Sequence, residues 1–150
     1  MIKMNIKITS PAFKDRGMIP SKYTCDGDNT SPPLNIEIDK GAETLVLIVD
    51  DPDAPMGVWD HWIVWNISPD VKNIEEDSVP QNSIQGTNSS GKSSYGGPCP
   101  PSGTHRYRFK LYALDKKLDL SSSARKSDVE REMKGHILAQ AEMVGLYSRK

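Results

Sequence analysis

Three short segments of the chain concentrate side chains that could bind a charged ligand or move a proton. They are Asp50–Pro55, Trp59–Trp62 and the longer stretch Tyr95–Tyr107, which is rich in glycine and proline. The imidazoles within them can donate, accept or carry charge near neutral pH. The backbone amides of a Gly/Pro loop can form a concave nest for an anion. In combination, these residue types favour the binding of a small anion.

The first two segments are expected to meet because only a short connection separates them. If a strand ending at Asp50 pairs with a strand starting at His61, then Asp51 comes to lie near His61. A carboxylate beside an imidazole fixes the tautomer of the ring and raises its pKa. His105 opens a third strand and can face the same rim, together with the hydroxyl of Tyr107. The sequence therefore predicts a cup lined by two imidazoles, a phenol and backbone amides.

Proline and aromatic residues are expected to form the walls of this cup. Prolines such as Pro55 and Pro101 stiffen the backbone, so that less conformational entropy is lost on binding. Trp59 would add an apolar wall. Taken alone, each segment has a simpler explanation, because an Asp-Pro-Asp sequence is commonly a turn and a single histidine is commonly a structural residue. The three segments together favour a binding site.

The segment Gly86–Ser93 matches the phosphate-loop pattern of nucleotide-binding ATPases. A working phosphate loop follows a buried strand and opens a helix, so that amides and the helix N-terminus converge on the phosphates. Here two glycines and three prolines within Gly96–Pro101 exclude a stable helix after the motif. We therefore expect no nucleotide site, and we interpret the stretch from Val79 to Gly103 as an ordered functional loop.

The pattern of apolar residues indicates one β-rich domain over residues 1–150. Met1–Ser10 alternates apolar and polar side chains like a strand. Thr44–Asp50 contains a continuous apolar run, typical of a strand buried on both faces. Strands first and one main helix late predict an all-β fold with helical appendages. The other strands expected are Leu34–Ile38, His61–Ile67 and the alternating His105–Leu114.

The C-terminal third changes to a helical period. Ser127–Glu130 has the sequence of a capping box, in which the serine bonds forward and the glutamate bonds back to satisfy two free amides. An apolar stripe at helical spacing follows and predicts a helix packed on the core. Its members are Val129, Met133, Ile137, Ala141 and Val144.

The composition excludes several classes of function. Charged residues make up 26% of the chain and the net charge is −1, so there is no global attraction to nucleic acid or to an acidic membrane. The longest apolar run, Leu45–Val49, is too short to cross a bilayer. The N-terminal pattern is not that of a signal peptide. We therefore expect a cytoplasmic protein without stable membrane insertion.

The two cysteines, Cys25 and Cys99, both lie in turn-rich segments. In a reducing compartment two free thiols are expected. The alternative is a disulfide that joins the two loops, which the cytosol of hyperthermophiles permits. The distance between the two Cα atoms decides between them, and sequence alone does not give it.

The motifs of these segments resemble the two signature regions of the phosphatidylethanolamine-binding (Raf kinase inhibitor-like) protein family. The first is Asp51–Pro55 with His61 and Trp62, and the second is Gly97–Pro101 with Gly103–Tyr107. Further motifs resemble the short bacterial and archaeal YbhB/YbcL-type branch, and the similarity extends from Ile6 to Tyr147. These further motifs are Tyr23–Gly27, Ser31–Leu34 and Gly135–Ala139.

This resemblance implies an antiparallel β-sandwich with a few peripheral helices. It also implies a small pocket that in relatives accepts phosphate, phosphorylethanolamine, acetate or cacodylate. Asp51 and His61 would form one wall, the loop from Cys99 to Pro101 another, and His105 and Tyr107 would complete the cup. The implied surrounding residues are Asp53, Pro55, Trp59 and Tyr95.

Two departures from the family pattern favour a small oxyanion over a phospholipid head group. The short branch lacks the long C-terminal helical extension that closes the pocket in eukaryotic members. Cys99 stands where eukaryotic relatives often have glycine.

The expected function is a regulatory or inhibitory binding module for a small oxyanion, with no catalytic residue, metal or cofactor. One alternative is a metal-assisted hydrolase, in which the carboxylates and imidazoles of the cup hold the metal, or a hydrolase in which Ser102 is the nucleophile beside His105. Another is an inhibitor of a protein kinase or protease that acts through a protein interface. The resemblance to the bacterial branch also suggests a homodimer.

Overall fold

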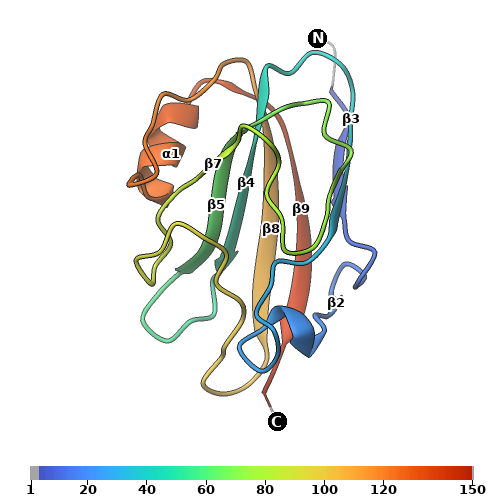
Figure 1. Cartoon of the computed structure of the whole chain (residues 1–150), viewed down its shortest axis with the longest axis vertical. Coiled ribbons are helices and arrows are strands. Elements are labelled where there is room, and N and C mark those ends of the chain that lie inside the picture. The colour runs from blue at the N-terminus through green and yellow to red at the C-terminus, as the bar shows by residue number, and fades with distance from the viewer. Residues whose placement is uncertain (1–3, 150) are drawn as a thin grey trace.

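The computed structural model describes residues 4–149 as two β-sheets with one α-helix (Figure 1). The strands are β1 (Ile6–Thr9), β2 (Gly17–Met18), β3 (Leu34–Ile38), β4 (Thr44–Asp51), β5 (Trp59–Ile67), β6 (Asn73–Ile74), β7 (Ile84–Gln85), β8 (His105–Leu114) and β9 (Ile137–Tyr147). The helix is α1 (Lys126–Met133), and Ser21–Tyr23 forms one 3₁₀ turn. The larger sheet has the order β2-β9-β8-β4-β5-β7 and the smaller has the order β1-β3-β6. The predicted all-β fold with its helix near the C-terminus is confirmed.

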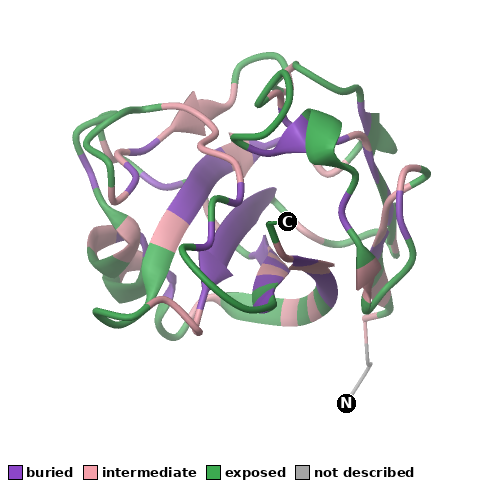
Figure 2. Cartoon of the chain, turned by 90° about the horizontal axis from the view of Figure 1, so that it is seen from below, coloured by how far each residue is buried: buried purple, intermediate pink, exposed green. Residues whose placement is uncertain are grey.

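Strand β4 is buried on both faces, which explains its continuous apolar run. Leu47 belongs to the core cluster that also contains Phe109 of β8 and side chains of the smaller sheet. Ile48 faces the other way and packs in a second cluster with Val129 and Met133 of α1. Viewed from below, the buried strands are surrounded by exposed loops (Figure 2). Strand β4 is therefore packed on both faces, against the smaller sheet on one side and against α1 on the other.

The predicted helix is wrong beyond Met133. The helix ends there, Gly135 adopts a left-handed φ of +83°, and Ile137–Tyr147 forms strand β9. Residues four apart lie on one face of a strand as well as of a helix, so the spacing of Ile137 and Ala141 fits both structures. Antiparallel pairing with β8 along the whole strand supplies the hydrogen bonds that decide between them.

The helix start also differs from the prediction. Its first residue is Lys126, and the Asp128 carboxylate accepts a hydrogen bond from the Arg125 amide at 2.9 Å. This is the role predicted for Glu130, so the cap lies two residues earlier than the Ser127–Glu130 pattern indicates. At the other end of the chain, the predicted strand Met1–Ser10 appears as β1, and residues 1–3 lie outside the described part.

The segment that resembles a phosphate loop is an irregular turn. The Asn88 side-chain oxygen accepts hydrogen bonds from the amides of Ser90 and Lys92, at 3.0 and 3.1 Å, which closes the segment on itself. The short strand β7 precedes it and no helix follows before β8, so the elements of a nucleotide site are missing from this stretch. No helix within residues 4–149 combines the length and apolar character needed to cross a membrane.

Cys25 and Cys99 form a disulfide, with their Cα atoms 5.4 Å apart. The expectation of two free thiols is therefore wrong for this structure, and the alternative holds. The bond joins the turn after the 3₁₀ segment to the loop before β8. It connects parts of the chain that are 74 positions apart, which explains why the pairing could not be read from local sequence.

Candidate functional site

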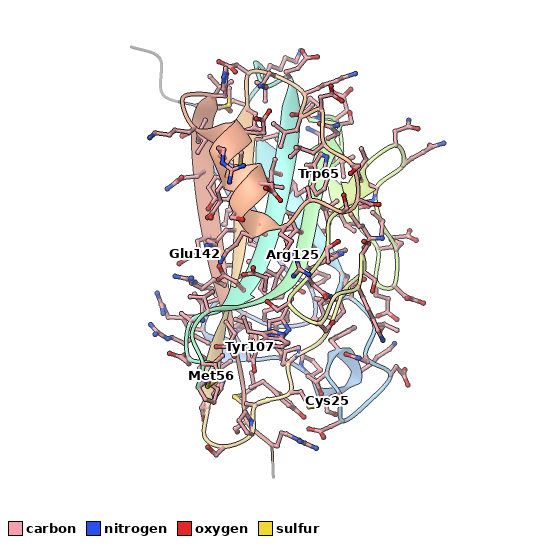
Figure 3. All side chains as sticks on the ribbon, turned by 90° about the vertical axis from the view of Figure 1, so that its left-hand side faces the viewer. Cys25, Met56, Trp65, Tyr107, Arg125 and Glu142 are labelled. Carbon is pink, nitrogen blue, oxygen red and sulfur yellow. A yellow bond between two sulfur atoms is a disulfide. The ribbon has the colours of Figure 1, made fainter. Side chains whose placement is uncertain are left out.

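A cavity of about 270 Å³ lies at the end of the larger sheet where β4 ends and where β5 and β8 begin. The β4–β5 connection and the loop before β8 both reach this lower end in Figure 1. In Figure 3, Tyr107 and Met56 lie in the same lower half of the molecule, away from Trp65. The lining residues are Asp51, Ala54, Pro55, Trp59, His61, Gly97, Cys99, Pro100, Pro101, His105 and Tyr107.

The structure thus brings all six predicted ligand contacts around one cavity, which was the geometric condition for the proposed cup. Asp51, His61, Cys99, Pro101, His105 and Tyr107 all line it. Their contact with a ligand stays a prediction. Sequence reasoning missed Ala54 and Gly97 as lining residues, whereas Pro100 belongs to the predicted wall Cys99–Pro101. Ala54 precedes the predicted Pro55, and Gly97 lies two positions before Cys99.

The partner of Asp51 is His105 rather than His61. The Asp51 carboxylate and Nδ1 of His105 are 2.7 Å apart, and both residues are buried. The predicted pairing of Asp51 with His61 is therefore wrong. The register between β4 and β5 shifts after Val49, so that Val49 lies opposite Trp62 and the next residue opposite Asp60. His61 is skipped by this β-bulge, and a bulge re-aims the side chain that it leaves unpaired.

His61 is oriented by the loop before β8. Its Nδ1 lies 2.7 Å from the carbonyl oxygen of Gly96, and the Gly96 amide donates to the His61 carbonyl at 2.9 Å. Burial lowers the pKa of His61, and the hydrogen bond with Gly96 and the charge of Asp51 offset this only in part. The predicted rise in the pKa of His61 is therefore wrong, because burial outweighs the nearby carboxylates.

Both histidines have a defined tautomer. A carbonyl or carboxylate oxygen can only accept, so Nδ1 carries the proton in His61 and in His105. In each neutral ring the remaining nitrogen, Nε2, is an acceptor that becomes a donor only when the ring takes up a proton. The cavity is therefore lined by two rings whose second nitrogen is available to a ligand.

Tyr107 lies between the two imidazoles. Its ring centroid is 5.2 Å from that of His61, in an edge-on arrangement, and 6.4 Å from that of His105. The hydroxyl is buried and has no hydrogen-bond partner among the described residues. Burial raises the pKa of Tyr107, and the negative charges of Asp51 and Asp53 raise it further. The phenol therefore stays protonated and has an unused donor.

The residues predicted around the cup divide into two groups. Pro55 and Trp59 line the cavity, and Trp59 is 43% exposed. Asp53 does not line it but binds Arg106, whose Nη2 lies 2.8 Å from Asp53 Oδ1. The Arg106 side chain lowers the pKa of Asp53 to about 2. Asp53 therefore anchors the β4–β5 connection to the start of β8.

Tyr95 does not line the cavity either. Its hydroxyl donates to the Tyr23 carbonyl at 2.8 Å, and its ring meets Trp62 edge-on with centroids 5.5 Å apart. Burial raises the pKa of Tyr95. Its place is behind the loop, where it holds the segment before Gly97 against the 3₁₀ turn.

Comparison with known proteins agrees with this fold. The family model for phosphatidylethanolamine-binding protein matches residues 9–148. A UPF0098 protein of Methanothermobacter thermautotrophicus is 54% identical, with 97% of this chain and 99% of the relative covered. The UPF0098 protein PH1269 of Pyrococcus horikoshii is 46% identical, with 99% of this chain and 79% of the relative covered.

Two solved structures share the fold over nearly their whole length. The crystal structure of CT736, a phosphatidylethanolamine-binding protein homologue of Chlamydia trachomatis, has a TM-score of 0.93 and 42% identity, covering 97% of this chain and 98% of that one. The crystal structure of Escherichia coli YbcL, a member of the mammalian phosphatidylethanolamine-binding protein family, has a TM-score of 0.90 and 31% identity, covering 97% and 99%. This chain belongs to the phosphatidylethanolamine-binding protein family.

Proposed function

We propose that this chain binds a small oxyanion in the cavity between His61 and His105, and that it acts as a regulatory or inhibitory binding protein rather than as an enzyme. The ligand would be phosphate, a phosphorylethanolamine-like group or a carboxylate such as acetate. The observation that carries the proposal is the buried Tyr107 hydroxyl without a partner among residues 4–149. An unpaired buried donor costs roughly 1–3 kcal/mol, and a bound anion would remove this cost.

The surroundings of the hydroxyl support an anion of limited size. A cavity of about 270 Å³ has room for a phosphoryl group with a short substituent. The two imidazoles can supply further donors once protonated, and Asp51 keeps the His105 ring in place from the side of Nδ1. Because the net charge of the chain is −1, recognition would rest on these local donors.

The residues named in the two hydrolase alternatives are poorly placed for catalysis. Ser102 lines a different hollow from the one that contains His105, so a serine–histidine pair has no support. Within residues 4–149, no group of three His, Cys, Asp or Glu side chains has the arrangement of a metal site. No observation therefore favours a hydrolase over a binding protein.

Apolar side chains near the cavity favour a protein as the larger partner. Met56 and Val58 in the β4–β5 connection and Trp59 at the start of β5 are 97%, 48% and 43% exposed. Exposed apolar groups that cluster beside a polar pocket mark interaction sites. We propose that a protein kinase or protease contacts this rim, with the oxyanion as part of the recognised group.

The first test is thermal melting with and without phosphate. Phosphate at about 100 times its dissociation constant should stabilise the wild-type chain by roughly 2.7 kcal/mol. Tyr107→Phe should lose most of this shift, because it removes the donor and keeps the ring. Without phosphate the variant should melt at or slightly above the wild-type temperature, since the lost hydroxyl made no hydrogen bond within the described residues.

Tyr95→Phe is the matched control. It removes a hydroxyl that is bonded to the Tyr23 carbonyl and lies outside the cavity, so the phosphate shift should persist. A wild-type protein that shows no shift at millimolar phosphate contradicts the proposal, and so does an undiminished shift in Tyr107→Phe.

Binding should strengthen as the pH falls from 8 to 5.5. Burial lowers the pKa of His61, so its ring is neutral at pH 7 in the empty cavity. A bound anion favours the protonated ring, so binding takes up a proton, and affinity rises by up to about tenfold per pH unit for each proton taken up. Sulfate is the suitable ligand, because it does not titrate in this range. Calorimetry across the range measures the dissociation constant and the proton uptake.

The third histidine provides the control for this pH dependence. His136 pairs with Asp115 on the surface, with Nδ1 2.8 Å from the carboxylate, and does not line the cavity. His136→Gln should keep the wild-type profile. A sulfate affinity that stays constant from pH 8 to 5.5 would show that neither imidazole charges on binding.

A further inference from the structure

The Cys25–Cys99 disulfide lies in the wall of the candidate site. Cys99 lines the cavity, next to Pro100 and Pro101, whereas Cys25 lies outside it. Both cysteines are exposed. A disulfide that solvent reaches is accessible to attack by a thiolate, unlike one that is buried in a core.

Hydrogen bonds hold the part of this wall before Cys99, at residues 97 and 98. The Gly97 amide donates to the Asn29 side-chain oxygen at 2.9 Å, and the Cys25 amide donates to the Pro98 carbonyl at 3.1 Å. Within the described chain, no hydrogen bond connects residues 99–104 to any other segment. Pro100 is buried and adds packing. The disulfide is therefore the strongest link that holds residues 99–104 in place.

A second hollow lies on the other side of the same wall. It has a volume of about 820 Å³, and Pro101 lines both hollows. Asp26, the neighbour of Cys25, lines only the second, together with Ser102 and Tyr147. The tethered loop thus separates the small cavity from a larger and more open groove.

We propose that the Cys25–Cys99 bond is a site of thiol–disulfide exchange, and that its reduction loosens the wall and weakens oxyanion binding. The inference rests on the proposed function for its effect on binding. The oxidised state keeps residues 99–101 against the cavity. In the reduced state this segment gains mobility. Binding then has to order residues 99–101 again, and the conformational entropy lost in doing so weakens the affinity.

The reductant is a dithiol. One of its thiolates attacks a cysteine sulfur, a mixed disulfide forms, and the other cysteine leaves as a thiolate that takes up a proton. The second thiol of the reductant then displaces the first cysteine and forms the disulfide of the reductant. Two electrons and two protons pass to the protein in total, which leaves two cysteine thiols.

The test compares wild-type protein before and after treatment with dithiothreitol, with phosphate as the probe. Calorimetry should show a dissociation constant about tenfold higher in the reduced state, a typical size for coupling between two sites. Relaxation measurements should show amide order parameters of Ser102 and Gly103 falling from about 0.85 to below about 0.6. Far-ultraviolet circular dichroism at 25 °C should be unchanged, which shows that the fold persists.

Cys25→Ser is the matched variant, because it removes the tether and leaves Cys99 in the cavity wall. It should bind phosphate as weakly as reduced wild type and should not respond to dithiothreitol. Equal affinity in both redox states overturns the proposal, and so do order parameters that do not change on reduction. Absence of phosphate binding in the oxidised protein refutes the proposed function instead. The order parameters of Ser102 and Gly103 then show whether reduction loosens the loop.

Discussion

Asp50→Ala is expected to lower the free energy of unfolding by about 3–5 kcal/mol, the usual cost of removing one partner from a buried ion pair. Asp50 lies on β4, and its carboxylate is fully buried against cations of β8 and α1. It binds Arg108 Nε at 2.8 Å, Lys110 Nζ at 2.9 Å and Lys126 Nζ at 3.2 Å. Its removal takes away the carboxylate that Arg108 and Lys110 share, whereas Lys126 keeps Asp60 at 2.8 Å. Urea denaturation at pH 7 measures the loss.

The pH dependence of stability provides a second signature of this network. Burial by itself would raise the pKa of Asp50, but the hydrogen bonds from Arg108 and Lys110 together lower it below 3.8. A lowered folded-state pKa contributes stability above pH 3.8, and this is lost as the pH falls through the folded-state value. Asp50→Ala should therefore show a weaker acid dependence than wild type.

Asp53→Ala is the control, because Asp53 also pairs with an arginine of β8 but is only half-buried. Arg106 is 56% exposed in that pair, so solvent screens the interaction, and losing it should cost less than losing Asp50. A loss of less than 1 kcal/mol for both variants would show that the Asp50 network contributes little to stability. The comparison separates the effect of burial from the effect of charge pairing.

The strands could be predicted where burial leaves a local pattern. Leu34–Ile38 and His105–Leu114 have the predicted bounds. In both strands buried and exposed residues alternate, and the alternation of apolar and polar side chains in the sequence reflects this directly. Strand β9 could not be predicted in this way. Its apolar residues four positions apart suit a helix equally well, and only the pairing with β8 excludes the helix. Tertiary hydrogen bonding overrides the local period there.

The site shows the same division between local and distant information. The end-of-strand positions of Asp51, His61 and His105 placed them near one rim without knowledge of the fold. Which imidazole receives the Asp51 carboxylate depends on how β4 pairs with β8 and with β5, and neither register has a signal in the sequence. Consequently the residue types were predictable, but the electrostatic partner of each histidine was not.

The long-range contacts that hold the loop before β8 could not be predicted from the sequence either. Gly97 meets Asn29 across 68 positions, and the disulfide spans 74. Neither contact can be inferred from the positions of the residues in the sequence, because both depend on where the turn after Ser21–Tyr23 packs. Gly97 nevertheless has a strict steric role, and its replacement tests whether this packing controls the cavity.

Gly97→Ala should destabilise the chain by about 3 kcal/mol and abolish most phosphate binding, because a new methyl group has no room there. Its Cβ would lie 2.5 Å from the carbonyl oxygen of Tyr23 and 3.0 Å from Cα of Thr24, and it would also collide with the Asn29 side chain. Two of these neighbours are backbone atoms, so the loop itself has to move. The movement would break the bond from the Gly97 amide and displace the wall that begins at this residue.

Gly96→Ala is the matched control at the adjacent position. The nearest atoms to its added Cβ are Asn88 Nδ2 at 3.4 Å and the His61 carbonyl oxygen at 3.8 Å, which are ordinary contact distances. This variant should stay within about 1 kcal/mol of wild type and keep the phosphate-dependent rise in melting temperature. Thermal melting of both variants with and without phosphate makes the comparison. Equal behaviour of the two would mean that the close approach at Gly97 does not hold the cavity wall in place.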